Sequence, residues 1–164
     1  MTRRRTPSCG QARAHLRPTM KARVNLSPIP MQLADFTDFL AAARAQPEPQ
    51  RLLFVFAVAE LPQAHTPGQA RRFREGRGGA LAPVMCVDKA VDELDGFAAL
   101  ADESRATGQP WDMVFVAALA GERGTAPQPA GIDRGLKMMI DAVHRGAIER
   151  FLAFDPRGDA VRFA

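Results

Sequence analysis

The sequence predicts an α/β protein in which helices pack on one mixed sheet of about five strands. Continuous apolar runs, typical of buried strands, alternate three times with segments that have a helical period. Each connection between successive runs spans about 20 to 30 residues, which is long enough for a crossover helix. The chain ends in two short apolar segments around a turn. We therefore expect parallel strands joined by right-handed crossovers, followed by an antiparallel hairpin.

The first helix and the first strand are predicted directly after Met31. The helix has an apolar stripe at the i, i+3, i+4 and i+7 positions, formed by Phe36, Phe39, Leu40 and Ala43. Pro47 and Pro49 end it. Residues 52–59 are then an unbroken apolar run, which is typical of a strand buried on both faces, as central parallel strands are.

A second helix and a second strand follow. Thr66-Pro67-Gly68-Gln69 is a capping box with proline at the first helical position, which predicts a short helix to about Glu75. Residues 81–87 form the second predicted strand. Pro83 lies near its start and argues against the middle of a sheet ladder at that point.

The second half of the chain continues the alternation. A helix around Phe97 precedes a third apolar strand over residues 111–119. The next helix has an apolar stripe formed by Ile132, Leu136, Met139, Ile140 and Val143. Residues 151–154 and 161–163 are short strands, and the Pro and Gly between them are placed as in a hairpin turn.

The basic charge is concentrated at the N-terminus. The chain has 22 Lys and Arg against 18 Asp and Glu, but residues 1–30 hold seven of the basic side chains and no acid. This segment has no periodicity. We expect either a disordered tail or translation that begins at Met31 or Met20, with residues 31–164 as the single domain. Nucleic acid is an expected partner only through this tail.

The cysteines and the apolar runs bear on the compartment. Cys9 and Cys86 are the only two cysteines, and Cys9 lies in the tail. This excludes a disulfide framework and favours a reducing cytoplasm. The longest apolar runs have eight residues, whereas a membrane-spanning helix needs about 20. We expect a soluble cytoplasmic protein.

Charged residues that follow the predicted strands are the candidate ligand-binding residues. In a parallel sheet, ligands bind beyond the carboxyl ends of the strands. That rule selects Glu60, Asp88 with Lys89, Glu122 with Arg123, and Asp155. A carboxylate beside an ammonium group could move a proton or hold an anion. The alternative interpretation is that these are ordinary strand ends in contact with solvent.

Cys86 is the candidate nucleophile, and with Asp88 and Lys89 it forms the candidate catalytic group. The thiolate of a catalytic cysteine needs a base or a cation nearby, and Lys89 could supply the cation. The alternative is that Cys86 is a small core residue, because the strand around it is apolar.

Metal and cofactor sites are not indicated. The three histidines are widely spaced, and the pair Asp141 and His144 gives at most two ligands, below the three or four of a zinc site. The glycine-rich residues 75–79 lead from a helix into a strand, whereas a phosphate-binding loop leads from a strand into a helix. We therefore expect neither a metal nor a cofactor.

A basic patch occurs in the second predicted helix and just beyond it. It consists of Arg71, Arg72, Arg74 and Arg77. Such a patch could bind RNA or an acidic partner. No aromatic ladder of the kind used by single-strand binders accompanies it, which favours a solvated helix face.

Three segments of the chain carry a resemblance to a known family: residues 46–56, residues 83–89, and residues 154–158 with 161–163. They resemble a small proteobacterial family whose members often carry the label "ribonucleotide reductase subunit alpha". The resemblance covers the chain from about residue 31 and implies a start at Met31. The order of short strands and helices is also similar to that of the amino-terminal domains of type III secretion enhancer proteins.

The residues do not support the reductase label. Ribonucleotide reduction needs a radical cysteine and a redox pair beside it, whereas residues 31–164 contain one cysteine. The radical-generating subunit is excluded as well, because the chain has no tyrosine and no paired Glu-x-x-His helices. We therefore expect a protein-binding or regulatory module rather than an enzyme. The alternatives are a small-molecule enzyme that uses Cys86, Asp88 and Lys89, and nucleic-acid contact through residues 1–30.

Overall fold

The computed structural model describes residues 33–75 and 78–163. The predicted tail and Cys9 lie outside these residues. The helices are α1 (Phe36–Arg44), α2 (Pro67–Arg74), α3 (Phe97–Arg105) and α4 (Pro129–His144), with a 3-10 turn η1 (Val91–Glu93). The strands are β1 (Gln50–Glu60), β2 (Ala80–Ala90), β3 (Met113–Ala120), β4 (Leu152–Phe154) and β5 (Ala160–Val161).

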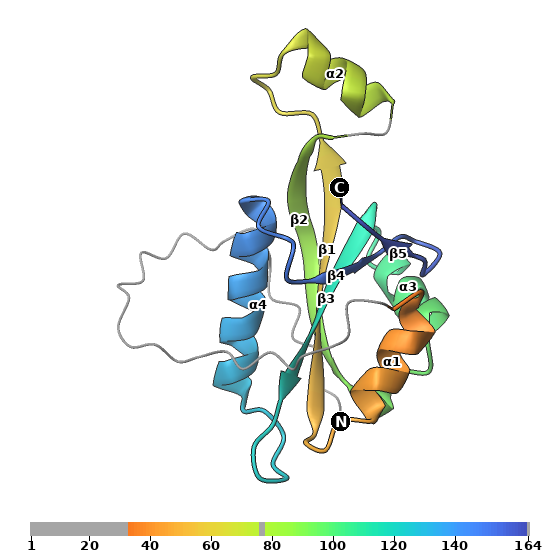
Figure 1. Cartoon of the computed structure of the whole chain (residues 1–164), viewed down its shortest axis with the longest axis vertical. Coiled ribbons are helices and arrows are strands. Elements are labelled where there is room, and N and C mark those ends of the chain that lie inside the picture. The colour runs from red at the N-terminus through yellow and green to blue at the C-terminus, as the bar shows by residue number, and fades with distance from the viewer. Residues whose placement is uncertain (1–32, 76–77, 164) are drawn as a thin grey trace.

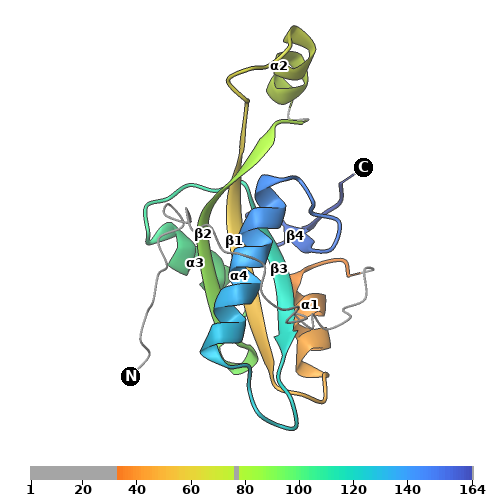
Figure 2. The ribbon, with the colours of Figure 1, turned by 90° about the vertical axis from the view of Figure 1, so that its left-hand side faces the viewer.

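The five strands form one open sheet in the order β2-β1-β3-β4-β5, and every pairing is antiparallel. The predicted parallel strands and crossovers are therefore wrong. The reason is that a continuous apolar run reports burial on both faces and says nothing of strand direction. β1 is such a strand, since it lies between β2 and β3 with helices on both faces of the sheet (Figures 1 and 2). The C-terminal hairpin of β4 and β5 is confirmed.

The sheet separates two apolar cores. On one face, α4 packs against odd-numbered residues of β1 and β3, including Leu53, Val55 and Phe115. On the other face, α1 and α3 pack against even-numbered residues, including Leu52 and Phe54. The two faces follow from the period of two along each strand. Figure 2 shows α4 in front of the sheet and α3 behind it.

The first helix forms as predicted. The carboxylate of Asp35 accepts a hydrogen bond from the Asp38 amide at 3.0 Å and so caps α1. The ring of Phe36 contacts Phe154 of β4 edge-on, with 5.4 Å between the ring centroids. This contact ties the first helix to one of the last strands of the chain.

The connection from β1 to β2 projects beyond the body of the protein. β3 pairs with residues 50–57 of β1. Among the described strands, residues 58–60 of β1 therefore pair with β2 alone. This two-stranded ribbon carries α2 beyond the rest of the molecule (Figure 1). We call residues 58–75 and 78–82 the arm, and α2 the arm tip.

Pro83 lies where the arm joins the body. It pairs with Ala57, at a break in the β1–β2 register between Phe56 and Ala57. β2 is also an edge strand, so a residue without an amide proton is tolerated there. This agrees with the sequence-based argument against the middle of a ladder.

None of the described helices combines the length and the apolar character that crossing a membrane requires.

Candidate functional site

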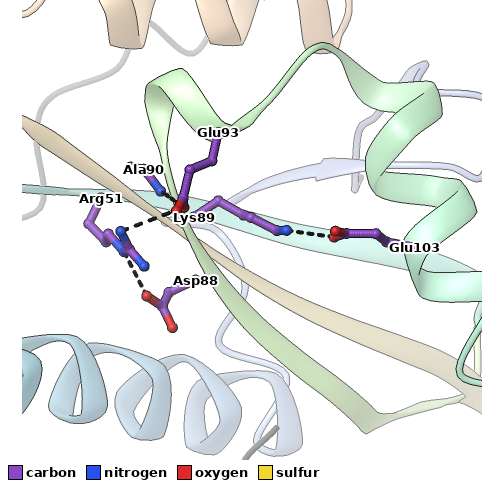
Figure 3. A network of polar contacts seen from close by, with 6 residues as sticks. All are labelled: Arg51, Asp88, Lys89, Ala90, Glu93 and Glu103. Carbon is purple, nitrogen blue, oxygen red and sulfur yellow. Dashed lines mark hydrogen bonds and ion pairs between the residues drawn. The ribbon is translucent and has the colours of Figure 1, made fainter. Parts of the chain in front are cut away.

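A network of ion pairs lies at the end of β2 (Figure 3). Asp88 contacts Arg51 of β1, with 2.6 Å between Oδ2 and Nε. The same guanidinium lies 3.7 Å from the carboxylate of Glu93, measured from Nη1 to Oε2. That carboxylate also accepts a hydrogen bond from the amide of Ala90 at 2.8 Å. The end of β2 is thus fixed to the start of β1.

Lys89 belongs to the other face of the sheet. Its Nζ lies 2.6 Å from Oε2 of Glu103 on α3, and its side chain is 19% exposed. In the register, Lys89 is opposite Leu52 and Asp88 is opposite Leu53, and these leucines lie in different cores. Figure 3 shows the two side chains leaving β2 in different directions.

Cys86 is in the core on the α4 face and is 4% exposed. It shares that face with Asp88 by the period of two, whereas Lys89 lies on the opposite face. The candidate catalytic group is therefore divided by the sheet. The thiol is buried, and Lys89 lies on the far face, so Lys89 does not supply the cation that the prediction assigned to it.

The other candidates do not all lie at one end of the sheet, because neighbouring antiparallel strands terminate at opposite ends. Glu60 ends β1 on the arm, opposite Ala80. Glu122 and Arg123 follow β3 near the start of β1, at the same end of the sheet as Asp88.

Two of these candidates act within local turns. The amide of Glu122 donates to the carbonyl of Thr125 at 3.0 Å, and the reverse hydrogen bond is 2.9 Å long. The carboxylate of Asp155 accepts hydrogen bonds from the amides of Arg157 at 2.9 Å and Asp159 at 3.0 Å. These contacts shape the turns after β3 and β4. Among the described residues, no group of three or more potential ligands could hold a metal ion.

Three members of the ion-pair network were not predicted from the sequence: Arg51, Glu93 and Glu103. The second strand was predicted to end at Val87, whereas β2 continues to Ala90. The alternation of faces along a strand was the signal that would have separated Asp88 from Lys89.

The arm tip is a well-formed helix without a core of its own. Thr66 caps it: Oγ1 accepts from the Gln69 amide at 3.2 Å, and Oε1 of Gln69 accepts from the Thr66 amide at 2.8 Å. The predicted capping box is confirmed. No residue of α2 is buried.

Three arginines of the arm tip are exposed, and within the described part of the chain they have no ion-pair partner. They are Arg71, Arg72 and Arg74. A hollow of about 410 Å³ lies between α2 and the ribbon, lined by Leu61, Pro62, Gln69, Arg72, Gly78, Gly79 and Ala80. The arm tip thus combines uncompensated positive charge with a partly apolar hollow.

Asp112 fixes the arm where it leaves the body. Its Oδ2 accepts a hydrogen bond from the amide of Ala59 at 2.8 Å. Its own amide donates to the carbonyl of Ala57 at 2.9 Å. This pair of bonds extends the pairing of β1 beyond the start of β3.

No protein-family model, no curated protein and no solved structure matches this chain.

Proposed function

We propose that this protein is a protein-binding module whose arm tip contacts an acidic surface of another protein. The observation that carries the proposal is the placement of Arg71, Arg72 and Arg74 on a projecting helix, exposed and without a described ion-pair partner. Exposed positive charge on a projecting element is suited to recognition, because it steers a partner of opposite charge.

The charge of the rest of the domain supports this assignment. Residues 31–57 and 83–164 carry 11 basic and 16 acidic side chains, whereas residues 58–82 carry four basic and two acidic. An acidic partner is therefore attracted to the arm tip and repelled by the body. The projection of α2 keeps the contact away from the body (Figure 1).

The same features favour a protein over a nucleic acid as the partner of the arm tip. A nucleic acid is a long polyanion, and it would meet the acidic body beyond the arm tip. The one aromatic side chain of α2, Phe73, contacts Gly79 of the ribbon, and a single ring is not the aromatic ladder that single-strand binders use. The enzyme alternative has less support, because Cys86, Asp88 and Lys89 do not converge.

The proposal is tested by charge reversal at the arm tip. The full-length protein and the triple variant R71E, R72E, R74E are immobilised and exposed to an extract of the source cells. We expect a partner retained by the parent protein to be reduced about tenfold with the variant, because like charges then oppose. The bound proteins are quantified by mass spectrometry, with and without nuclease treatment of the extract.

The matched control reverses three cations on α4 and after it, in the variant R134E, K137E, R150E. These side chains are exposed and make no described ion pair. Equal loss with both variants would refute the arm tip as the specific surface. Loss of all retained material on nuclease treatment would show nucleic acid as the ligand and contradict the proposal.

A further inference from the structure

We propose that the hollow beside α2 binds an aliphatic side chain of the partner, while an acidic residue of the same segment contacts Arg72. The inference rests on the proposed function and names the chemistry of its partner, which is an acidic segment with one aliphatic anchor. The hollow measures about 410 Å³. This lies near the lower end of the range of about 300–1,000 Å³ for ligand pockets. In size, the hollow suits a side chain rather than a whole helix.

The ribbon side of the hollow is apolar. It consists of Leu61, Pro62, Gly78, Gly79 and Ala80. None of these residues has a polar side chain, so a charged or amide group placed against them would lose its hydration without gaining a side-chain partner. An aliphatic group is therefore the chemistry that this wall accepts.

The helix side of the hollow supplies hydrogen-bond donors. Gln69 and Arg72 are three residues apart and so lie on the same side of α2. Of the described residues that line the hollow, Arg72 alone is charged. Oε1 of Gln69 already accepts from the Thr66 amide at 2.8 Å, which leaves Nε2 as a donor. A carboxylate next to an aliphatic group matches these donors and the apolar wall together.

The ribbon that carries the hollow is apolar along its length. Residues 58–62 and 80–82 contain a single charged residue, Glu60. None of these residues is buried, although the ribbon projects from the body (Figure 1). Apolar surface outside a core, with charged groups at its rim, is typical of a protein-interaction site.

The arginines account for attraction, whereas the hollow can account for selection. An exposed ion pair contributes little by itself and is screened by salt. The binding energy of protein interfaces is concentrated in a few side chains that fill pockets. Arg72 lies at the hollow, and Arg71 and Arg74 are on the same helix outside its lining. An acidic segment drawn to the arginines is thereby brought to a place where an aliphatic side chain can enter.

The first test compares defined peptides on the full-length protein. One short fluorescein-labelled peptide has Asp, Glu and Ser residues around a single leucine. A second has serine in place of that leucine, and a third keeps the leucine but has Asn and Gln in place of the acids. Dissociation constants are measured by fluorescence anisotropy at low ionic strength. We expect the first peptide to bind at least about fivefold tighter than either of the others, because it alone has both the anchor and the carboxylates.

Two variants test the hollow itself. A80W fills it and L61S removes apolar surface from its wall, and neither changes an arginine. We expect each variant to reduce the preference for leucine over serine to less than about twofold, with the binding of the serine peptide unchanged. A98W is the control and should keep the preference, because Ala98 is an exposed residue of α3 and does not line the hollow. Hydrogen exchange in α2 checks that the arm is retained in each variant.

The outcomes separate this inference from the proposed function. Equal binding of the leucine and serine peptides to the parent protein overturns the aliphatic anchor, but the proposed function stands if R71E, R72E, R74E still weakens both. Failure of both acidic peptides to bind also overturns the inference, and the extract experiment then decides on the proposed function. A leucine preference that survives A80W and L61S contradicts the hollow as the site. Self-association of the protein that A80W abolishes would identify a second copy as the occupant instead.

Discussion

Adjacent residues of β2 have different roles because successive side chains of a strand point to opposite faces. Cys86 is buried beneath α4, Asp88 pairs with Arg51, and Lys89 crosses to Glu103 on the other face. Three residues that are close in sequence therefore take part in three separate sets of contacts. Cys86 contributes to core packing, whereas Asp88 and Lys89 hold the end of β2 in place through ion pairs.

Cys86 provides a direct check of this assignment. In a C9S background, we expect iodoacetamide to modify Cys86 slowly in the native protein and rapidly in urea, because the residue is 4% exposed. We expect K89A to leave the native rate unchanged, since Lys89 lies on the other face. Mass spectrometry of timed samples measures the rate. Fast native labelling that K89A abolishes would support the enzyme alternative instead.

Gly79 is required where the chain turns from α2 into β2. Its φ is +105°, and a Cβ atom would lie 2.9 Å from the ring of Phe73 and 3.0 Å from the carbonyl oxygen of Glu60. We expect Gly79→Ala to destabilise the arm by about 1–3 kcal/mol, through backbone strain and displacement of the ring. Limited proteolysis should show faster cleavage within the arm.

Gly131 is a suitable control for that substitution. It lies in the first turn of α4, and a Cβ atom there would have no neighbour within 4 Å. We expect Gly131→Ala to stabilise the protein by up to about 1 kcal/mol, because alanine favours the helix. Equal destabilisation by both substitutions would contradict the steric explanation for Gly79.

Among the elements, the arm depends on few contacts outside itself. α2 is stabilised by its capping box and by Phe73 against Gly79, while the ribbon is fastened to the body by Asp112. A projecting element of this kind can be well formed and still change its angle to the body.

Asp112 therefore sets how firmly the arm is held. We expect D112A to increase hydrogen exchange at the Ala59 amide, which loses its acceptor. The free energy of unfolding should fall by only about 0.5–1.5 kcal/mol, the usual contribution of one hydrogen bond. D112N keeps an acceptor at this position and is expected to restore the protection. Unchanged exchange in D112A would show that Asp112 does not hold the arm.

Considered as one molecule, the protein has two cores that share the strands β1 and β3. Neither core is complete without these strands, so we expect the body to unfold as one cooperative unit. Phe36 and Met139 lie in different cores and are 2% and 0% exposed.

Truncation of either residue tests this coupling. We expect F36A and M139A each to lower the free energy of unfolding by about 2–5 kcal/mol, because each removes a buried side chain and leaves a cavity. Urea titrations followed by Trp111 fluorescence and by far-UV circular dichroism should give coincident transitions for both variants. Separate transitions in M139A would show that the two faces unfold independently.

The sequence by itself was sufficient for features that depend on nearby residues. The stripe of α1, the capping box before α2 and the turn between β4 and β5 all follow from spacings of a few positions, and the structure has each of them. The strand over residues 52–59 was also predictable, since its apolar run required burial on both faces. The basic patch of the arm tip was visible as well, but its projection from the body was not.

Only the tertiary structure decided the direction of the strands and the interaction partners of each charged residue. The run in β1 is equally compatible with parallel and antiparallel neighbours, and the choice rests on pairing with β2 and β3 over long sequence separations. The antiparallel order then sends Glu60 to the arm and leaves Asp88 at the opposite end of the sheet. Local spacing carries no information on such pairings, because their energy comes from contacts that exist only once the sheet has formed.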